Sequence, residues 1–258
     1  MKYLLLSVIL AASPFLLARA DAQPLELKPK AGDSSHESTL LQPDVDLTDS
    51  PTAFVLDYGG YSARSRFYSS GGVLQYLSFG VFPSLNIGAS LTADNLIGSD
   101  TTVRLREPGV QVKYRFYDGD RMLPSLAIGF DGQGYLYDQM RKRYNQRHRG
   151  LFLAASQELG LPGLLLHPSV NVSDFDSNSF FGALALSYNI QDKVSFMTEW
   201  DNINDIDNSR FNSGLRIYMT PGFHLDFAVR GIGQGGRYSD GISRGPERVV
   251  QIKYNGSF

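Results

Sequence analysis

Apolar and polar side chains alternate through most of the chain beyond residue 52. In one run, Ile87 and Leu91 alternate with Asn86 and Ser90. Because successive side chains of a strand point to opposite faces, such runs predict strands with one apolar and one polar face. The pattern predicts about twelve antiparallel strands, near residues 52–61, 72–82, 85–94, 108–117, 123–134, 150–158, 164–173, 179–190, 193–201, 209–219, 222–232 and 247–258.

The predicted polar faces carry full charges at mid-strand, for example Lys113, Asp226 and Arg230. A dry core would have to pair or exclude such charges, so a wet interior is favoured over two stacked sheets. Runs of about ten residues suit strands that cross a hydrocarbon layer at a tilt. The prediction is all-β: a single antiparallel transmembrane β-barrel of about 12 strands, with 10 to 14 as the range, over residues 52–258.

Connection lengths indicate the orientation of this barrel. Tight turns are expected at residues 82–84, 118–120, 160–163, 191–193 and 220–222, from their Pro, Gly and Asp content. Longer connections are expected at residues 63–71, 95–107, 135–149, 174–177, 202–209 and 233–246. Outer-membrane barrels have short periplasmic turns and longer extracellular loops, so both termini are expected in the periplasm of a Gram-negative-type bacterium.

The amino terminus has the features of an export signal. Lys2 precedes an apolar run over residues 3–17, and small residues follow at Ala18, Ala20 and Ala22. We expect a signal peptide over residues 1–22, cleaved after Ala20 or Ala22. Residues 23–51 lack periodicity and are expected to be a flexible periplasmic segment; the alternative is a plug folded into the barrel.

Composition narrows the possible chemistry. The 258 residues include 0 Cys, which excludes disulfides, thiolate metal sites and a lipid-acceptor Cys. A formal net charge of -2 gives no reason to expect a nucleic-acid partner. No cofactor or metal site is predicted.

The carboxyl end alternates up to an aromatic residue. Ile252, Tyr254 and Phe258 share the apolar face, opposite Lys253. This ending resembles the assembly signal of bacterial outer-membrane barrels. Expected partners are therefore outer-membrane lipid, lipopolysaccharide and the barrel assembly machinery.

Short motifs resemble the YjbH-like outer-membrane proteins associated with exopolysaccharide or capsule production. They are residues 129–135 (GFDGQGY), 199–202 (EWDN), 214–216 (GLR) and the closing residues 248–258. The resemblance implies a non-enzymatic barrel in exopolysaccharide or capsule secretion or in envelope organisation. Surface polysaccharide or its export proteins would then be partners.

Charged residues on the predicted inner face would project into one lumen. They form either a structural charge network or a path for a polar solute. The set is Lys113, Arg115, Asp131, Glu158, His167, Glu199, Asp201, Arg216, Asp226, Arg230 and Lys253.

The most basic stretch is the predicted loop over residues 135–149, with Arg141, Lys142, Arg143, Arg147 and Arg149. Guanidinium groups bind anions bidentately, so the loop could hold lipopolysaccharide phosphates or an acidic glycan. The alternative is a solvated loop.

Two further functions compete with polysaccharide secretion. One is a narrow porin-like channel for small polar solutes. The other is an outer-membrane lipid-modifying enzyme, for which His167, Ser169 and Asn171 would share one strand face. That face is the predicted lumen, away from lipid, and Pro168 suits a strand end, so no catalytic residue is predicted.

Overall fold

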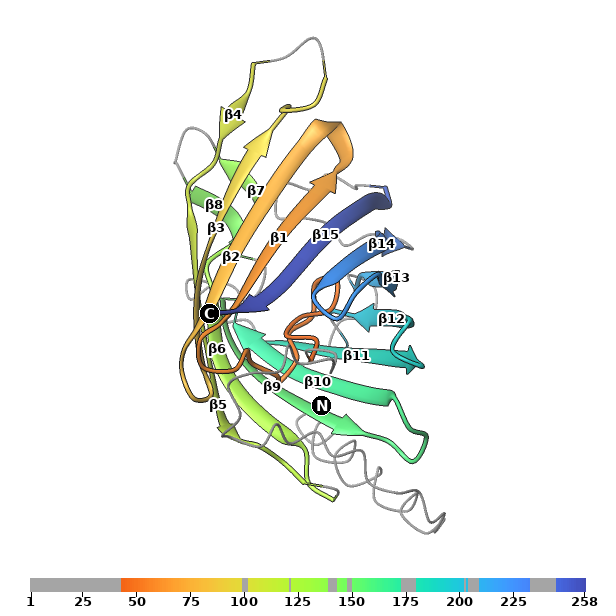
Figure 1. Cartoon of the computed structure of the whole chain (residues 1–258). Helices are drawn as coiled ribbons and strands as arrows, with labels where there is room; N and C mark the ends of the chain where they lie inside the picture. Colours follow the sequence, from red (N-terminus) through yellow and green to blue (C-terminus); the bar gives the residue numbers. More distant parts are fainter. Residues whose placement is uncertain are drawn as a thin grey trace.

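Twelve strands form the wall of a closed β-barrel (Figure 1). The computed structural model describes residues 43–98, 102–120, 122–138, 143–147, 150–172, 180–201, 203, 209–232 and 245–258. The wall consists of β1 (Gly60–Tyr68), β2 (Gly72–Phe82), β3 (Leu85–Asp94), β5 (Gly109–Tyr117), β6 (Ser125–Asp131), β9 (Gly150–Glu158), β10 (Leu164–Val172), β11 (Phe181–Ile190), β12 (Val194–Trp200), β13 (Phe211–Tyr218), β14 (Phe223–Ile232) and β15 (Glu247–Ser257).

All neighbouring wall strands are antiparallel, and each pairs with the next wall strand along the chain. The sheet closes where β1 pairs with β15, in a register that runs from Gly60 opposite Ser257 to Phe67 opposite Val250. Closure leaves no exposed edge in the wall, as a sheet in a membrane requires. The predicted single antiparallel barrel is confirmed.

Burial along the strands is the reverse of that in a water-soluble protein. Ile87 and Leu91 of β3 are 43% and 45% exposed on the outer surface, whereas Asn86 and Ser90 are 5% and 2% exposed inside. The same alternation continues through the last strand, where Lys253 is buried. A wall that turns apolar groups outward and polar groups inward is suited to lipid outside and a polar lumen inside.

The two ends of the barrel differ in their connections, as predicted. Five connections of two to seven residues join β2–β3, β5–β6, β9–β10, β11–β12 and β13–β14. We call this the short-turn end, although the β5–β6 connection, residues 118–124, is longer than the predicted turn at 118–120. In the β5–β6 turn, the Asp120 carboxylate accepts hydrogen bonds from the backbone N of Met122 (2.7 Å) and Leu123 (2.8 Å). These bonds stabilise the charged form and hold the pKa of Asp120 below its ordinary 3.8.

The opposite end, the long-loop end, carries the longer connections. They include the two-residue strand β4 (Arg104–Leu105), which pairs with β3, and a separate hairpin of β7 (Gly134–Asp138) and β8 (Arg143–Arg147). One connection departs from the prediction: β1 and β2 are joined only by the 3₁₀ turn η2 (Ser69–Gly71). No helix in the described ranges is long and apolar enough to span a membrane.

The first strand does not lie where the sequence predicted it. Residues 52–61 were expected to be a strand and residues 63–71 a loop, but β1 spans Gly60–Tyr68. The apolar residues Ala53, Val55 and Leu56 mimic a strand pattern, yet they are buried inside the barrel. The true strand alternates Arg64 and Arg66 inward with smaller or aromatic residues outward.

Candidate functional site: the lumen and the segment that fills it

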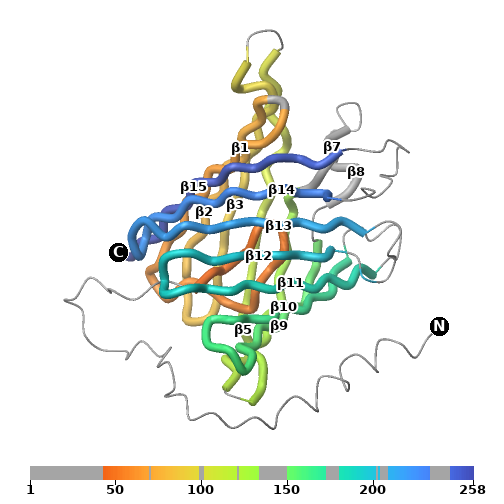
Figure 2. Tube along the Cα trace, turned by 90° about the vertical axis from the view of Figure 1, so that its right-hand side faces the viewer, coloured from red at the N-terminus to blue at the C-terminus, as the bar shows by residue number. Residues whose placement is uncertain are grey.

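Residues 43–56, the lumen segment, run inside the barrel before the chain enters β1 (Figure 2). The segment forms a narrow hairpin, because Asp46 and Pro51 pair as an antiparallel bridge. Its turn is closed by hydrogen bonds from the N of Leu47 to the O of Ser50 (3.1 Å) and from the N of Thr52 to the O of Val45 (3.4 Å). The tip of the hairpin is therefore at residues 48–49.

This course changes the expectation for the amino-terminal segment. Residues 23–51 were expected to be flexible and periplasmic, but residues 43–51, the part of that range that the structure describes, are packed within the lumen. They match the plug alternative. A barrel of this strand number is wider than one that wall side chains can fill, so an additional segment can occupy its interior. The signal peptide and residues 23–42 lie outside the described residues.

The first limb of the hairpin begins near the short-turn end. Asp44 forms an ion pair with Arg216, which is fully buried, and lies 3.9 Å from the Nζ of Lys253. The hydroxyl of Tyr218 donates a hydrogen bond of 2.7 Å to Asp44. Three wall side chains from two strands, β13 and β15, thus hold this carboxylate.

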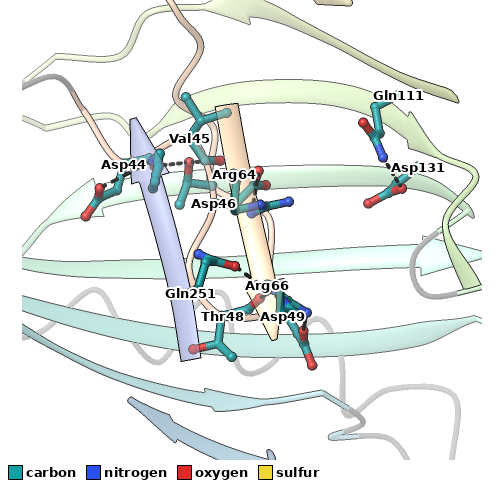
Figure 3. Close-up of polar contacts among 12 residues, drawn as sticks. Asp44, Val45, Asp46, Thr48, Asp49, Arg64, Arg66, Gln111, Asp131 and Gln251 are labelled. Carbon is teal, nitrogen blue, oxygen red and sulfur yellow. Dashed lines mark hydrogen bonds and ion pairs between the residues drawn. The ribbon is translucent and has the colours of Figure 1, made fainter. Parts of the chain in front are cut away.

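Asp46 lies further along the same limb, between two other wall cations. Its carboxylate is 3.5 Å from Arg64 of β1 and 3.6 Å from Lys113 of β5. Lys113 also donates to the backbone O of Val45, at 2.6 Å. The limb is therefore held through its backbone as well as through its charge. Figure 3 shows Asp46 beside Arg64.

At the tip, Asp49 lies between a second cation of β1 and a cation of β14. Its carboxylate is 2.8 Å from Arg66 of β1 and 2.8 Å from Arg230 of β14. Arg66 also donates to the backbone O of Thr48 (Figure 3). The carboxylate of Glu199 in β12 accepts hydrogen bonds from the backbone N of Asp49, at 2.9 Å and 3.0 Å.

The second limb returns to the short-turn end. The N of Ala53 donates to the Oγ of Ser156 in β9 (2.8 Å), and the N of Leu56 donates to the Oδ1 of Asn86 in β3 (3.2 Å). The chain then crosses β2 at Gly80, where a Cβ would collide with the backbone O of Asp57. The absence of a side chain at Gly80 lets the chain leave the lumen and enter β1.

Wall residues also pair among themselves. Arg216 donates two hydrogen bonds of 2.7 Å to the carboxylate of Asp226, a bidentate arrangement across β13 and β14. Gln251 donates to Asp226 (2.7 Å) and accepts from Arg66 (3.2 Å). The segment is thus inserted into a wall whose side chains are already positioned by one another.

The structure brings together most of the predicted lumen residues. Buried or nearly buried in the lumen are Lys113, Asp131, His167, Glu199, Arg216, Asp226, Arg230 and Lys253. The other three lie at the strand ends: Arg115 pairs with Asp118 in a turn (2.6 Å), Glu158 accepts from the N of Gly163 (2.8 Å), and Asp201 pairs with Arg210 (2.5 Å). Alternation predicts whether a side chain points into or out of the barrel, but it does not predict the position of that side chain along the barrel axis.

Sequence reasoning missed several contributors. Arg64 and Arg66 fell in a predicted loop, and the three aspartates of the lumen segment fell in a predicted flexible region. Uncharged wall partners such as Asn212, which donates to Glu199 at 2.9 Å, carry no recognisable motif.

The basic stretch forms a hairpin where its backbone is described. Arg143 and Arg147 belong to β8, opposite Asp138 and Gly134 of β7. Arg141, Lys142 and Arg149 lie outside the described residues. Anion binding by this stretch stays a prediction.

His167 is not paired with Ser169, as the considered catalytic group required. Its Nδ1 lies 2.8 Å from the Oγ of Ser156 and its Nε2 lies 3.1 Å from the Oγ of Ser187. The edge of Phe54 also packs against the ring. His167 thus links two neighbouring strands to the lumen segment inside the barrel.

Small cavities remain between the lumen segment and the wall. A cavity of about 40 Å³ adjoins Asp46, Asn86 and Lys113, and a second of about 20 Å³ adjoins Val45 and Leu56. Cavities of this size hold a few water molecules. Within the described ranges, no group of three or more His, Asp or Glu side chains could hold a metal ion.

These observations define a class of protein: a membrane-type β-barrel whose polar lumen is filled by its own re-entrant segment. No protein-family model matches the chain, and no curated protein matches its sequence.

Three solved barrels illustrate what the chain is similar to. A mutant of the Rhodopseudomonas blastica porin is 11% identical over 72% of this chain, with a TM-score of 0.36. The match covers 55% of that porin, so the chain spans about half its length. The NanC porin is 13% identical over 77% of this chain and 99% of its own, with a TM-score of 0.40. The N-terminal β-barrel domain of Pseudomonas aeruginosa OprF is 11% identical over 76% of this chain and 96% of its own, with a TM-score of 0.25.

Proposed function

We propose that this chain is a porin-like outer-membrane barrel for small polar solutes, held closed by its lumen segment, residues 43–56. The observation that carries the proposal is a polar lumen occupied by a re-entrant hairpin. The outward apolar wall supports a place in lipid, and the short-turn end corresponds to the periplasmic side of such barrels.

The path of the segment supports a gate that can open. Its first limb contacts Tyr218 and Lys253 near the short-turn end, and its second limb returns to Asn86 at the same end. Both limbs therefore lie at one end, and the hairpin can withdraw without passing the chain through the barrel.

The interface between segment and wall also suits exchange with water. Hydrogen bonds and ion pairs hold the segment along its length, beside buried apolar side chains such as Leu47, Val55 and Leu56. When the segment withdraws, the polar wall side chains can form hydrogen bonds with water or with a solute, whereas apolar side chains could not.

Secretion of exopolysaccharide or capsule, implied by the YjbH-like motifs, stays a prediction. A filled lumen of this kind would have to be vacated before a glycan could enter. The enzymatic alternative has no support in the lumen, because the His167 contacts described above are with serines that also hold the segment or a neighbouring strand.

Planar-bilayer recordings test the proposal. The whole chain should be closed for most of the time, and the triple variant Asp44→Asn/Asp46→Asn/Asp49→Asn should open far more often. The matched control, Asp118→Asn/Asp120→Asn/Asp192→Asn, removes three acidic side chains from exposed turns and should behave like the whole chain. Equal open probability in the triple variant and the control would overturn the proposal.

A further inference from the structure

Cations outnumber acids in the wall of the lumen. In the described part of the wall, four acidic side chains accompany six cationic ones. The acids are Asp131, Glu199, Asp226 and the less deeply buried Glu247, and the cations are Arg64, Arg66, Lys113, Arg216, Arg230 and Lys253. The wall alone therefore carries an excess of positive charge, which Asp44, Asp46 and Asp49 offset.

The cations are arranged in pairs along the lumen. Arg216 and Lys253 hold Asp44, Arg64 and Lys113 hold Asp46, and Arg66 and Arg230 hold Asp49. These pairs follow the hairpin from the short-turn end towards the long-loop end. Each pair holds one carboxylate of the segment, and Arg216 and Arg230 also pair with the wall acids Asp226 and Glu247.

From this pairing we infer that the lumen binds and passes small polyanions, and that the three aspartates keep it closed by occupying the same cationic sites. The inference rests on the proposed channel and names its substrate class. A solute with two or three carboxylate or phosphate groups reproduces what the segment presents. Guanidinium groups hold both kinds of anion bidentately.

The mechanism follows from competition. Withdrawal of the hairpin leaves several cations in a confined polar space, where an isolated charge is poorly solvated and attracts counter-ions. A polyanion that enters replaces the lost ion pairs and so favours the open form. Binding of the anion and docking of the segment are mutually exclusive, so each weakens the other.

Ion selectivity of the Asp44→Asn/Asp46→Asn/Asp49→Asn variant tests the inference. In a potassium chloride gradient, its reversal potential should show that chloride permeates several-fold better than potassium. Citrate should obstruct the open variant, and it should raise the open probability of the whole chain. Pyrophosphate, used in parallel, distinguishes a phosphate preference from a carboxylate preference.

Lys113→Gln/Lys253→Gln, added to the triple variant, should weaken citrate binding by roughly tenfold for each lost ion pair. The matched control Arg115→Gln alters a cation in a turn pair and should leave binding unchanged.

The possible outcomes separate the two proposals. A variant that conducts but prefers potassium, or shows no preference, overturns the inference and leaves the channel standing. A variant that does not conduct overturns the channel. Calorimetric titration of citrate into the same refolded protein then decides the inference: binding that weakens in Lys113→Gln/Lys253→Gln supports it, and no binding overturns it.

Discussion

Asp49 at the tip of the hairpin offers the sharpest test of how the segment is held. Its carboxylate contacts Arg66 and Arg230, both at 2.8 Å, and its side chain is 6% exposed. Asp49→Asn keeps the shape and the backbone hydrogen bonds to Glu199. It removes the charge, so both guanidinium groups lose their shared counter-ion while the segment is docked.

The size of this effect follows from the burial of the pair. Removing one partner of a buried ion pair costs about 3–5 kcal/mol, because the other charge stays buried without compensation. The lower value applies here, since Asn still accepts hydrogen bonds. Because about 1.4 kcal/mol corresponds to a factor of ten, the undocked population should rise on the order of 100-fold.

A single introduced cysteine reports this population, since the chain has 0 Cys. Ser50 is 4% exposed at the tip, so Ser50→Cys should react with a water-soluble maleimide only when the segment is undocked. In the Asp49→Asn background its labelling rate should rise by about the same 100-fold. Asp118→Asn, in an exposed turn pair, should leave the rate unchanged.

An unchanged labelling rate in Asp49→Asn would refute the reasoning. So would fast labelling of Ser50→Cys in the otherwise unaltered chain, because the tip would then be accessible without any perturbation.

Three further substitutions test other parts of the account. Gly80→Ala brings a Cβ against the backbone O of Asp57 and should lower the temperature at which the folded, fast-migrating form is lost on a denaturing gel. His167→Leu leaves the hydroxyl of Ser156 without its imidazole partner, which should cost about 1–3 kcal/mol of folding free energy. The same temperature should therefore fall in this variant as well. Leu153→Arg puts a charge on the lipid-facing wall. It should lower the free energy of unfolding in phospholipid vesicles by about 2–4 kcal/mol, obtained from the folded fraction as a function of urea concentration.

Much of the wall could be predicted because its signal is local. The strict alternation around Ile87 and Phe227 fixes both the strand and the face of each side chain, and Pro, Gly and Asp mark the short turns. Closure into a barrel then follows from the number and length of the strands.

The lumen segment could not be predicted in the same way, since its contacts are distant in sequence. Asp49 meets Glu199 150 residues away, and no local pattern encodes that contact. Its apolar residues Val55 and Leu56 instead produced a false strand. Charge balance gave no signal either, because the predicted inner wall carried five cations and five acids besides His167, and Arg64 and Arg66 fell in a predicted loop.

Depth-dependent fluorescence quenching of a single tryptophan tests the central claim that the apolar face of this wall lies in lipid around a charged interior. The one native Trp is replaced by Trp200→Phe, and Ile128→Trp places the probe on the outer face in the middle of β6, where Ile128 is 42% exposed. In reconstituted vesicles we predict strong quenching by lipids brominated near the bilayer centre and little quenching by acrylamide. Strong acrylamide quenching with no effect of the brominated lipids would contradict the account.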